Sequence, residues 1–150
     1  MRRPLGFSLI ELIVVVVLIA ATTALAASVM TSGLPGQQLR GAARELAAQL
    51  RFTRAQAIVS GKPQRFILDT RTRQWQAPNG RHGLLPKQIE IVATGARIEQ
   101  TRSTVVAIRF FPEGAATGGR IVLSRERAAW QIDVEWLTGE VTVQRAEAPR

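Results

Sequence analysis

Residues 6–15 read GFSLIELIVV, and this stretch opens the most apolar part of a 150-residue chain. Glu11 is its one charged residue, and no further charge occurs before Arg40. The following residues, 12–30, would measure roughly 28 Å as an α-helix at about 1.5 Å per residue, close to the thickness of a bilayer's hydrocarbon core. The sequence therefore predicts a transmembrane helix over residues 7–30. A buried helix of a soluble domain is the alternative, but such helices rarely run so long without a polar face.

The short flank before this segment, residues 1–6, reads MRRPLG. Arg2 and Arg3 predict a cytoplasmic N-terminus with the bulk of the chain on the other side of the membrane, because basic flanks are retained inside. An ordinary secretory signal, cleaved among the small residues 24–28, would share this flank and apolar run. It would leave the acidic residue at position 11 unexplained.

Glu11 is the most unusual residue of the apolar segment. A central acidic residue costs about 2.5–3.5 kcal/mol on membrane-insertion scales, and less near the interface. Its carboxylate could extend to the lipid headgroups, or it could have a cationic partner inside the membrane. Cleavage after Gly6 would supply such a partner, because it exposes an α-amine on Phe7, one helical turn from Glu11 or within reach of a neighbouring subunit.

Residues 1–15 resemble the class III signal of type IV pilins and type II secretion pseudopilins. That signal combines a short basic leader, a Gly-Phe junction, a small hydroxyl residue, a Glu and an apolar run at this spacing. The resemblance implies that a prepilin peptidase removes residues 1–6 by cutting between Gly6 and Phe7 on the cytoplasmic side. The same enzyme would methylate the new amine.

The resemblance also implies a role for Glu11 in assembly. Its carboxylate would pair with the Phe7 amine of the same or a neighbouring subunit, and residues 7–30 would pass from the membrane into the core of a filament. The sequence departs from the common pattern at two positions, and the first departure is mild. Ser8 stands where Thr is common, and Ser28 stands where many relatives have a helix-kinking Pro.

A group of helix breakers separates the apolar segment from a second helical pattern. Residues 31–37 read TSGLPGQ and predict a hinge. Residues 38–60 then predict an amphipathic helix that needs a sheet to cover its apolar stripe, and they begin a globular domain over 38–150. The stripe consists of Leu39, Ala43, Leu46, Leu50 and Ala57. A second stripe, which could be a solvated face or could contact filament neighbours, anionic headgroups or DNA, consists of Arg40, Arg44, Arg51 and Arg54.

From residue 64 onward the pattern predicts strands. The expected strands are 64–69, 74–77, 89–92, 104–111, 120–124, 130–136 and 141–143, with a loop over 78–86 that contains His82. The clearest of them is 130–136, which alternates between an apolar face, Trp130, Ile132, Val134 and Trp136, and a polar face, Gln131, Asp133 and Glu135. A turn at 138–139 follows. One helix and about seven short strands predict an α+β fold with the helix laid across antiparallel sheet.

The composition excludes several kinds of chemistry. The chain has no cysteine and only one histidine, His82. A single histidine without cysteines is more typical of a solvated turn than of a metal or catalytic site. Residues 114–121 imitate a phosphate-binding loop, but Arg120 and Ile121 stand where Lys and Ser/Thr are needed, and a strand follows instead of a helix. Asp133 and Glu135 are typical of a half-exposed strand. We therefore predict no enzyme, no metal and no cofactor.

Segments of the strand-rich region are similar to the GspH family of minor pseudopilins and the related FimT pilins. They are Ile108 to Gly114, Gly118 to Ile121, and Asp133 to Val141. The resemblance covers nearly the whole chain. It implies a type IV pilin-like fold and a structural subunit at or near the tip of the periplasmic pseudopilus, which drives export of folded proteins across the outer membrane.

Partners and location follow from the same resemblance. The partners would be other minor pseudopilins, the major pseudopilin, the prepilin peptidase and the assembly platform of the inner membrane. The chain would cross that membrane once, with the N-terminus cytoplasmic and the C-terminal domain periplasmic, before it enters the pseudopilus.

The alternative function is that of a FimT-like minor pilin that binds DNA during DNA uptake. The net charge is +9, and the part from Arg40 onward still carries 18 basic and 10 acidic residues, 18 − 10 = +8. Residues 143–150 could add contacts. Against this alternative, the basic residues are scattered among acidic ones and no aromatic stacking platform is apparent. Nucleic acid is thus a partner only under this alternative.

Overall fold

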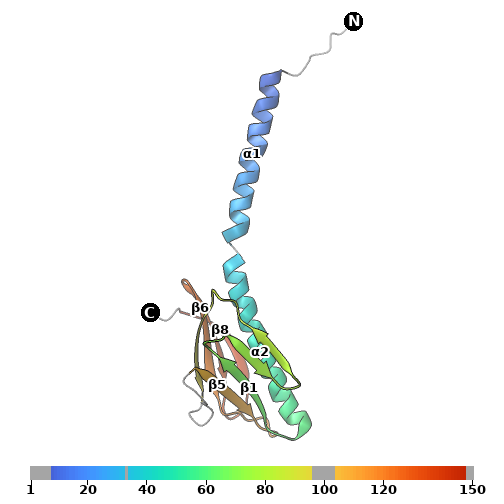
Figure 1. The fold of residues 1–150 in the computed structure, drawn as a ribbon, viewed down its shortest axis with the longest axis vertical. Coiled ribbons are helices and arrows are strands. Elements are labelled where there is room, and N and C mark those ends of the chain that lie inside the picture. Colours follow the sequence, from blue (N-terminus) through green and yellow to red (C-terminus); the bar gives the residue numbers. More distant parts are fainter. Residues whose placement is uncertain (1–7, 33, 96–103, 148–150) are drawn as a thin grey trace. The chain divides into compact units, whose positions relative to one another are not determined.

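A computed structural model describes residues 8–32, 34–95 and 104–147 (Figure 1). For 24–35 it describes the backbone of the helices and not the side chains. The chain divides into two compact units, Met1–Pro35 and Gly36–Arg150. The first contains one helix and the second contains most of another helix and all the described strands.

Helix α1 (Leu9–Ser32) occupies most of the first unit. It forms across a run of β-branched residues, Val14–Val17, whose intrinsic helix propensity is low. The hydroxyls of Thr22 and Thr23 are satisfied within the helix, because Thr22 donates to the Leu18 carbonyl (2.9 Å) and Thr23 to the Ile19 carbonyl (2.6 Å). Among the described side chains of this helix, only that of Glu11 opposes placement in apolar surroundings.

Helix α2 (Leu34–Ser60) begins four residues earlier than the sequence predicts. Pro35 is tolerated there because the first turn of a helix has no partner for the missing N–H group. Helix is also present at Thr31 and Ser32, so the predicted hinge at 31–37 is helical on both sides of Gly33, which lies outside the described residues. At the other end Gly61 adopts φ +62°, the usual left-handed cap of a helix.

The strands of the described part form two antiparallel sheets of four strands each. The first has the order β3-β2-β1-β5 and the second β4-β6-β7-β8. Their bounds are β1 Gln64–Asp69, β2 Gln74–Ala77, β3 Arg81–Leu84, β4 Glu90–Gly95, β5 Val105–Phe110, β6 Gly119–Arg125, β7 Ala128–Val134 and β8 Val141–Ala146. The predicted α+β class and the packing of a helix on antiparallel sheet are confirmed.

The sequence pattern predicts a loop over residues 78–86, but the structure has strand β3 within this segment. His82 belongs to this strand and pairs with Gln76 of β2. The next residue, Gly83, faces Trp75, and a Cβ built on it would stand 2.4 Å from the indole ring. In the sequence Gly83 indicates a loop, but in the structure its missing side chain leaves room for Trp75 to pack against the edge strand β3.

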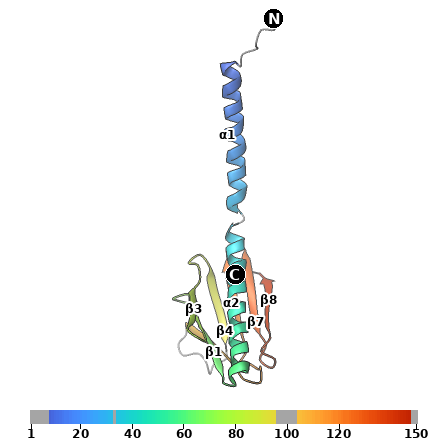
Figure 2. The same cartoon turned by 90° about the vertical axis from the view of Figure 1, so that its right-hand side faces the viewer.

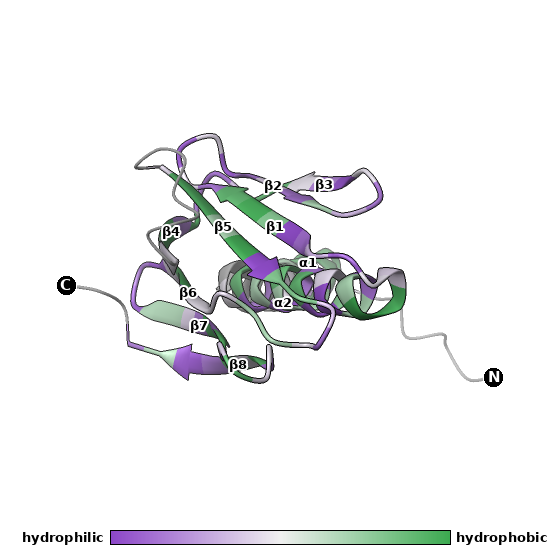
Figure 3. Ribbon diagram, turned by 90° about the horizontal axis from the view of Figure 1, so that it is seen from below, coloured by the Kyte–Doolittle hydropathy of each residue, from purple (hydrophilic) through white to green (hydrophobic). Residues whose placement is uncertain are grey.

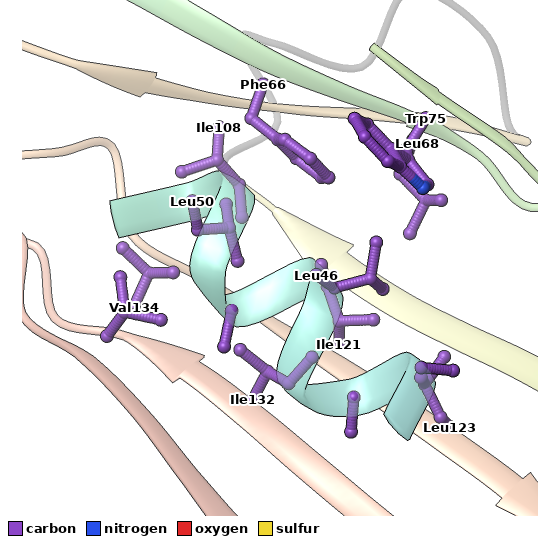
Figure 4. Packing of buried hydrophobic residues seen from close by; sticks show 14 of the residues in the cluster. Leu46, Leu50, Phe66, Leu68, Trp75, Ile108, Ile121, Leu123, Ile132 and Val134 are labelled. Carbon is purple, nitrogen blue, oxygen red and sulfur yellow. The ribbon is translucent and has the colours of Figure 1, made fainter. Parts of the chain in front are cut away.

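The core lies between α2 and both sheets (Figures 2 and 3). The predicted apolar stripe of α2 is confirmed, since all five of its members are fully buried. Figure 4 shows Leu46 and Leu50 between Phe66 of the first sheet and Ile132 of the second. Phe66 also stacks on Trp75, with ring centroids 6.3 Å apart. Burial of such side chains contributes about 1.5–3 kcal/mol each.

The strand predicted over 130–136 begins and ends two residues earlier. Ile132 and Val134 are buried as expected, and Trp130 is half-buried. The prediction that Trp136 joins this buried face is wrong, because β7 ends at Val134 and Trp136 is 64% exposed. The last strand is longer than predicted, so residues 143–146 of the supposed tail belong to β8, and 148–150 lie outside the described residues.

Candidate functional site

The acidic residue of the apolar segment lies in the first turn of α1. The backbone N–H of Glu11 donates to the carbonyl of Ser8 (3.0 Å), which starts the helix. A carboxylate in a first helical turn is stabilised by the helix dipole and the unpaired N–H groups there. Gly6 and Phe7, the two residues of the predicted cleavage junction, lie outside the described residues.

From Leu12 to Ala21, α1 presents apolar side chains on every side. From Leu12 to Ile19 each large apolar residue is between 46% and 63% exposed. A helix that is apolar all round belongs in a membrane or in the interior of an assembly. Within the described residues, no helix meets both the length and the apolarity that a membrane span requires.

The arginine stripe of α2 divides into two parts. Arg51 donates to the carbonyl of Val141 (2.8 Å) at the start of β8. Arg54 donates through Nε to the carbonyls of Gly114 and Thr138, both at 3.1 Å. These two arginines thus fasten α2 to the β5–β6 connection and the β7–β8 turn, which the sequence pattern could not show.

The other two arginines of the stripe, Arg40 and Arg44, are exposed, as Arg51 also is. Arg40 stacks over the ring of Trp130, with its guanidinium carbon 5.5 Å from the ring centroid. Arg44 is exposed. Arg145 lies opposite Trp130 in the register of β7 and β8, so basic side chains gather around this tryptophan.

Asp133 and Glu135 do not act as a pair of carboxylates. Asp133 accepts hydrogen bonds from Arg120 (2.6 Å), Gln131 (2.6 Å) and Gln144 (3.3 Å). Partial burial by itself would raise the pKa of Asp133, but the hydrogen bonds of Gln131 and Arg120 and the charge of Arg120 outweigh it and lower the pKa. Asp133 therefore stays ionised and serves a surface ion pair.

The remaining chemical candidates lie in an edge strand and in a connection between strands. His82 is exposed on β3, with Nδ1 2.9 Å from the Gly80 carbonyl oxygen. Residues 114–118 form part of the connection between β5 and β6, and its bridge between Phe110 and Ala116 confirms the interpretation as a loop between strands. No group of three or more His, Asp or Glu side chains that could hold a metal ion occurs in the described part of the chain.

An apolar helix joined to a compact domain, in which a second helix packs on antiparallel sheets, defines a pilin-like protein. The solved structures with this fold include the minor pseudopilin EpsH from the type 2 secretion system of Vibrio cholerae, with a TM-score of 0.58 at 13% identity over 72% of this chain and 97% of that one. The type IV minor pilin FimU of Pseudomonas aeruginosa has a TM-score of 0.57 at 12% identity, over 73% and 90% of the two chains. At these identities the likeness concerns the fold.

Sequence comparisons define the family. Residues 42–139 match the model of the type II transport protein GspH, and residues 1–27 match the prokaryotic N-terminal methylation motif. The type II secretion system protein H of Xanthomonas campestris pv. campestris is 52% identical over 141 residues, which cover 93% of this chain and 83% of that protein. The chain belongs to the GspH family and is a minor pseudopilin of type II secretion. The methylation motif implies anchoring in the inner membrane.

Proposed function

We propose that this minor pseudopilin is a structural subunit at or near the tip of the periplasmic pseudopilus, where it takes part in driving folded proteins across the outer membrane. The observation that carries the proposal is the placement of Glu11 in the first turn of a helix that is apolar on all sides from Leu12 to Ala21. Such a helix needs an apolar environment, and the pseudopilin family provides two: the membrane before assembly and the filament core after it.

The N-terminal sequence supports a processing step. A prepilin peptidase would cleave between Gly6 and Phe7 and methylate the Phe7 amine, since the methylation motif spans this junction. Glu11 would then pair with the amine of its own or a neighbouring subunit. A charge pair of this kind is strong in a low-dielectric interior, and it would fix the axial position of one helix against the next.

The charges around the apolar segment support a single-pass topology. Arg2 and Arg3 favour a cytoplasmic N-terminus, and the domain over 38–150 would lie in the periplasm. Its partners would be other minor pseudopilins, the major pseudopilin, the prepilin peptidase and the assembly platform. The domain would supply shape and contacts, in keeping with the structural interactions of the Arg120–Asp133 ion pair and of Arg51 and Arg54 on α2.

Replacement of Glu11 tests the proposal. The Glu11→Ala chain should be processed and recovered with the inner membrane, since removing a carboxylate favours insertion, yet it should be absent from purified pseudopili. Ser8→Thr is a matched control in the same turn, and it should assemble like the wild type. A Glu11→Ala chain that enters pseudopili in normal amounts would show that the pairing is not needed.

One observation favours the DNA-binding alternative. Five arginines lie near the first half of α2 and the adjoining ends of β6, β7 and β8, and none forms an ion pair within the described residues: Arg40, Arg44, Arg125, Arg127 and Arg145. Glu45, Glu126 and Glu147 are interspersed among them, which reduces the local positive potential. The secretion role therefore remains the better supported.

A further inference from the structure

A groove of about 710 Å³ lies on the second sheet. Its walls are the end of β4 (Thr94 and Gly95), residues 117–120 and residues 133–136. Arg120 and Asp133 pair across β6 and β7 on the face opposite Ile121 and Ile132, which are buried against α2. The groove therefore opens on the outer face of the domain, away from the core.

Trp136 forms part of the groove and is held in place by its backbone. Its carbonyl accepts a hydrogen bond from the N–H of Ala116 (2.9 Å). The turn that carries it is closed at Glu135, whose N–H donates to the Glu140 carbonyl and whose carbonyl accepts from Gly139, both at 2.9 Å. A Cβ built on Gly118 would stand 3.2 Å from the Trp136 Cβ, so the glycine lets the two segments approach closely.

The side chains at this turn are nevertheless unburied. Trp136 is 64% exposed and its neighbour Leu137 is 63% exposed. A large aromatic ring that stands out on a fixed backbone loses little conformational freedom on binding, and tryptophan is the residue most enriched at energetically dominant contact points. The exposure of two adjacent apolar side chains on a rigid turn points to a protein contact.

The charge of the groove indicates the chemistry of its occupant. Arg120 and Asp133 neutralise each other, with Arg120 Nε 2.6 Å from a carboxylate oxygen of Asp133. Glu135 also lines the groove, and within the described residues it forms no ion pair. The groove thus has a net negative charge, although the domain as a whole has more basic than acidic residues. A carboxylate beside an indole ring fits a lysine or arginine side chain, which can bond the first and stack on the second.

We propose that this groove receives a lysine- or arginine-bearing segment of a neighbouring pilin-like subunit, with Trp136 as the apolar anchor and Glu135 as the charge partner. The choice of a neighbouring subunit rests on the function proposed above. The groove itself is defined by this chain's own geometry and charge. Leu137 follows Trp136 in the chain, next to the residues that line the groove.

Photo-cross-linking in cells that contain the complete secretion system tests the proposal. A photoreactive amino acid replaces Leu137, which leaves Trp136 and Glu135 intact. We expect a cross-link to a peptide of another pilin-like subunit that contains Lys or Arg. The same probe at Leu84, which is equally exposed on the first sheet, is the control and should give no such product. Equal cross-linking at both positions, or none at Leu137, would overturn the proposal.

Two variants test whether Trp136 and Glu135 contribute to the contact. Trp136→Ala and Glu135→Lys should each reduce the Leu137 cross-link by about tenfold or more, the effect of losing a dominant contact residue. Glu135→Lys lies on an exposed position and keeps the test decisive if Trp136→Ala lowers the amount of protein. If the cross-link persists undiminished in both variants, the groove is not the binding site.

Glu11→Ala separates this proposal from the proposed function. Both predict that the Leu137 cross-link depends on assembly, so this variant should lack it while it remains in the inner membrane. A cross-link that survives Glu11→Ala but disappears in Glu135→Lys would support the groove and contradict the assembly role of Glu11. A cross-link that is lost in Glu11→Ala but retained in Glu135→Lys would support the assembly role of Glu11 and contradict the groove as the binding site.

Discussion

Gly139 of the β7–β8 turn lies directly against Gly114 of the β5–β6 connection, and a Cβ built on Gly139 would stand 2.2 Å from the Gly114 carbonyl oxygen. Arg54 joins the two segments, because its Nε donates to the carbonyls of Gly114 and Thr138. Residues from three distant parts of the chain thus meet at one point. Two of these parts are segments by which the sequence resembles the GspH family.

Gly139→Ala should destabilise the domain through this contact. The residue has φ +64°, which alone costs an alanine about 1 kcal/mol, and the clash with a backbone oxygen requires a shift of one of the two loops. We expect a loss of about 2–4 kcal/mol in the free energy of unfolding of residues 36–150, measured with urea. Gly80→Ala is the control, because Gly80 has φ +72° and open space around it, and it should lose only about 1 kcal/mol. Equal losses would mean that the close approach is unimportant.

Leu46→Ala should weaken the packing of α2 between the sheets. Leu46 is fully buried, so the change removes apolar contacts and leaves a cavity, at about 2–5 kcal/mol. Leu84→Ala, at an exposed position of β3, should change the free energy of unfolding by less than about 0.5 kcal/mol. The same urea titration measures both. A small effect at Leu46 would contradict the position of α2 in the core.

The stability of the domain should depend on pH through Asp133. Its pKa in the folded domain lies below the ordinary value, so ionised Asp133 stabilises the fold above the pKa of an unfolded aspartate, about 3.9. This contribution disappears as the pH falls through the lower folded pKa. Asp133→Asn should therefore be less stable than the wild type at pH 7 and equally stable near pH 2 in urea titrations. A difference that is unchanged by acid would exclude the ionised carboxylate as its source.

DNA binding by the domain should be weak. Arg51 and Arg54 are engaged in bonds to backbone carbonyls, and the remaining arginines are mixed with acidic residues. Titration of residues 36–150 with duplex DNA should give a dissociation constant weaker than about 1 µM at 150 mM salt, within the non-specific range. Arg40→Gln should weaken it only slightly. Tighter binding that Arg40→Gln abolishes would favour the role in DNA uptake.

Much of the fold could be predicted because its signals are local. The strands 64–69 and 74–77 were predicted with the bounds that the structure has, since the turn between them carries its own signal: Asp69 accepts hydrogen bonds from the N–H groups of Arg71 and Thr72. The apolar stripe of α2 follows likewise from helical periodicity. β3 and the exposure of Trp136 could not be predicted, because both depend on which distant segments pack beside them.

The sequence by itself determined the class of protein. Its N-terminal signal is local, since it consists of a basic leader, a Gly-Phe junction, Glu11 and an apolar run at fixed spacing along the chain. The alternating pattern of the strands is local too and can be recognised without knowing which strands pair. The tertiary structure alone decided what the arginines and the aromatic residues do. Arg54 links two loops, and Trp136 is exposed instead of lying in the core. The physical reason is that burial and hydrogen bonding depend on contacts between residues far apart in sequence, such as Arg54 with Thr138, which no local pattern encodes.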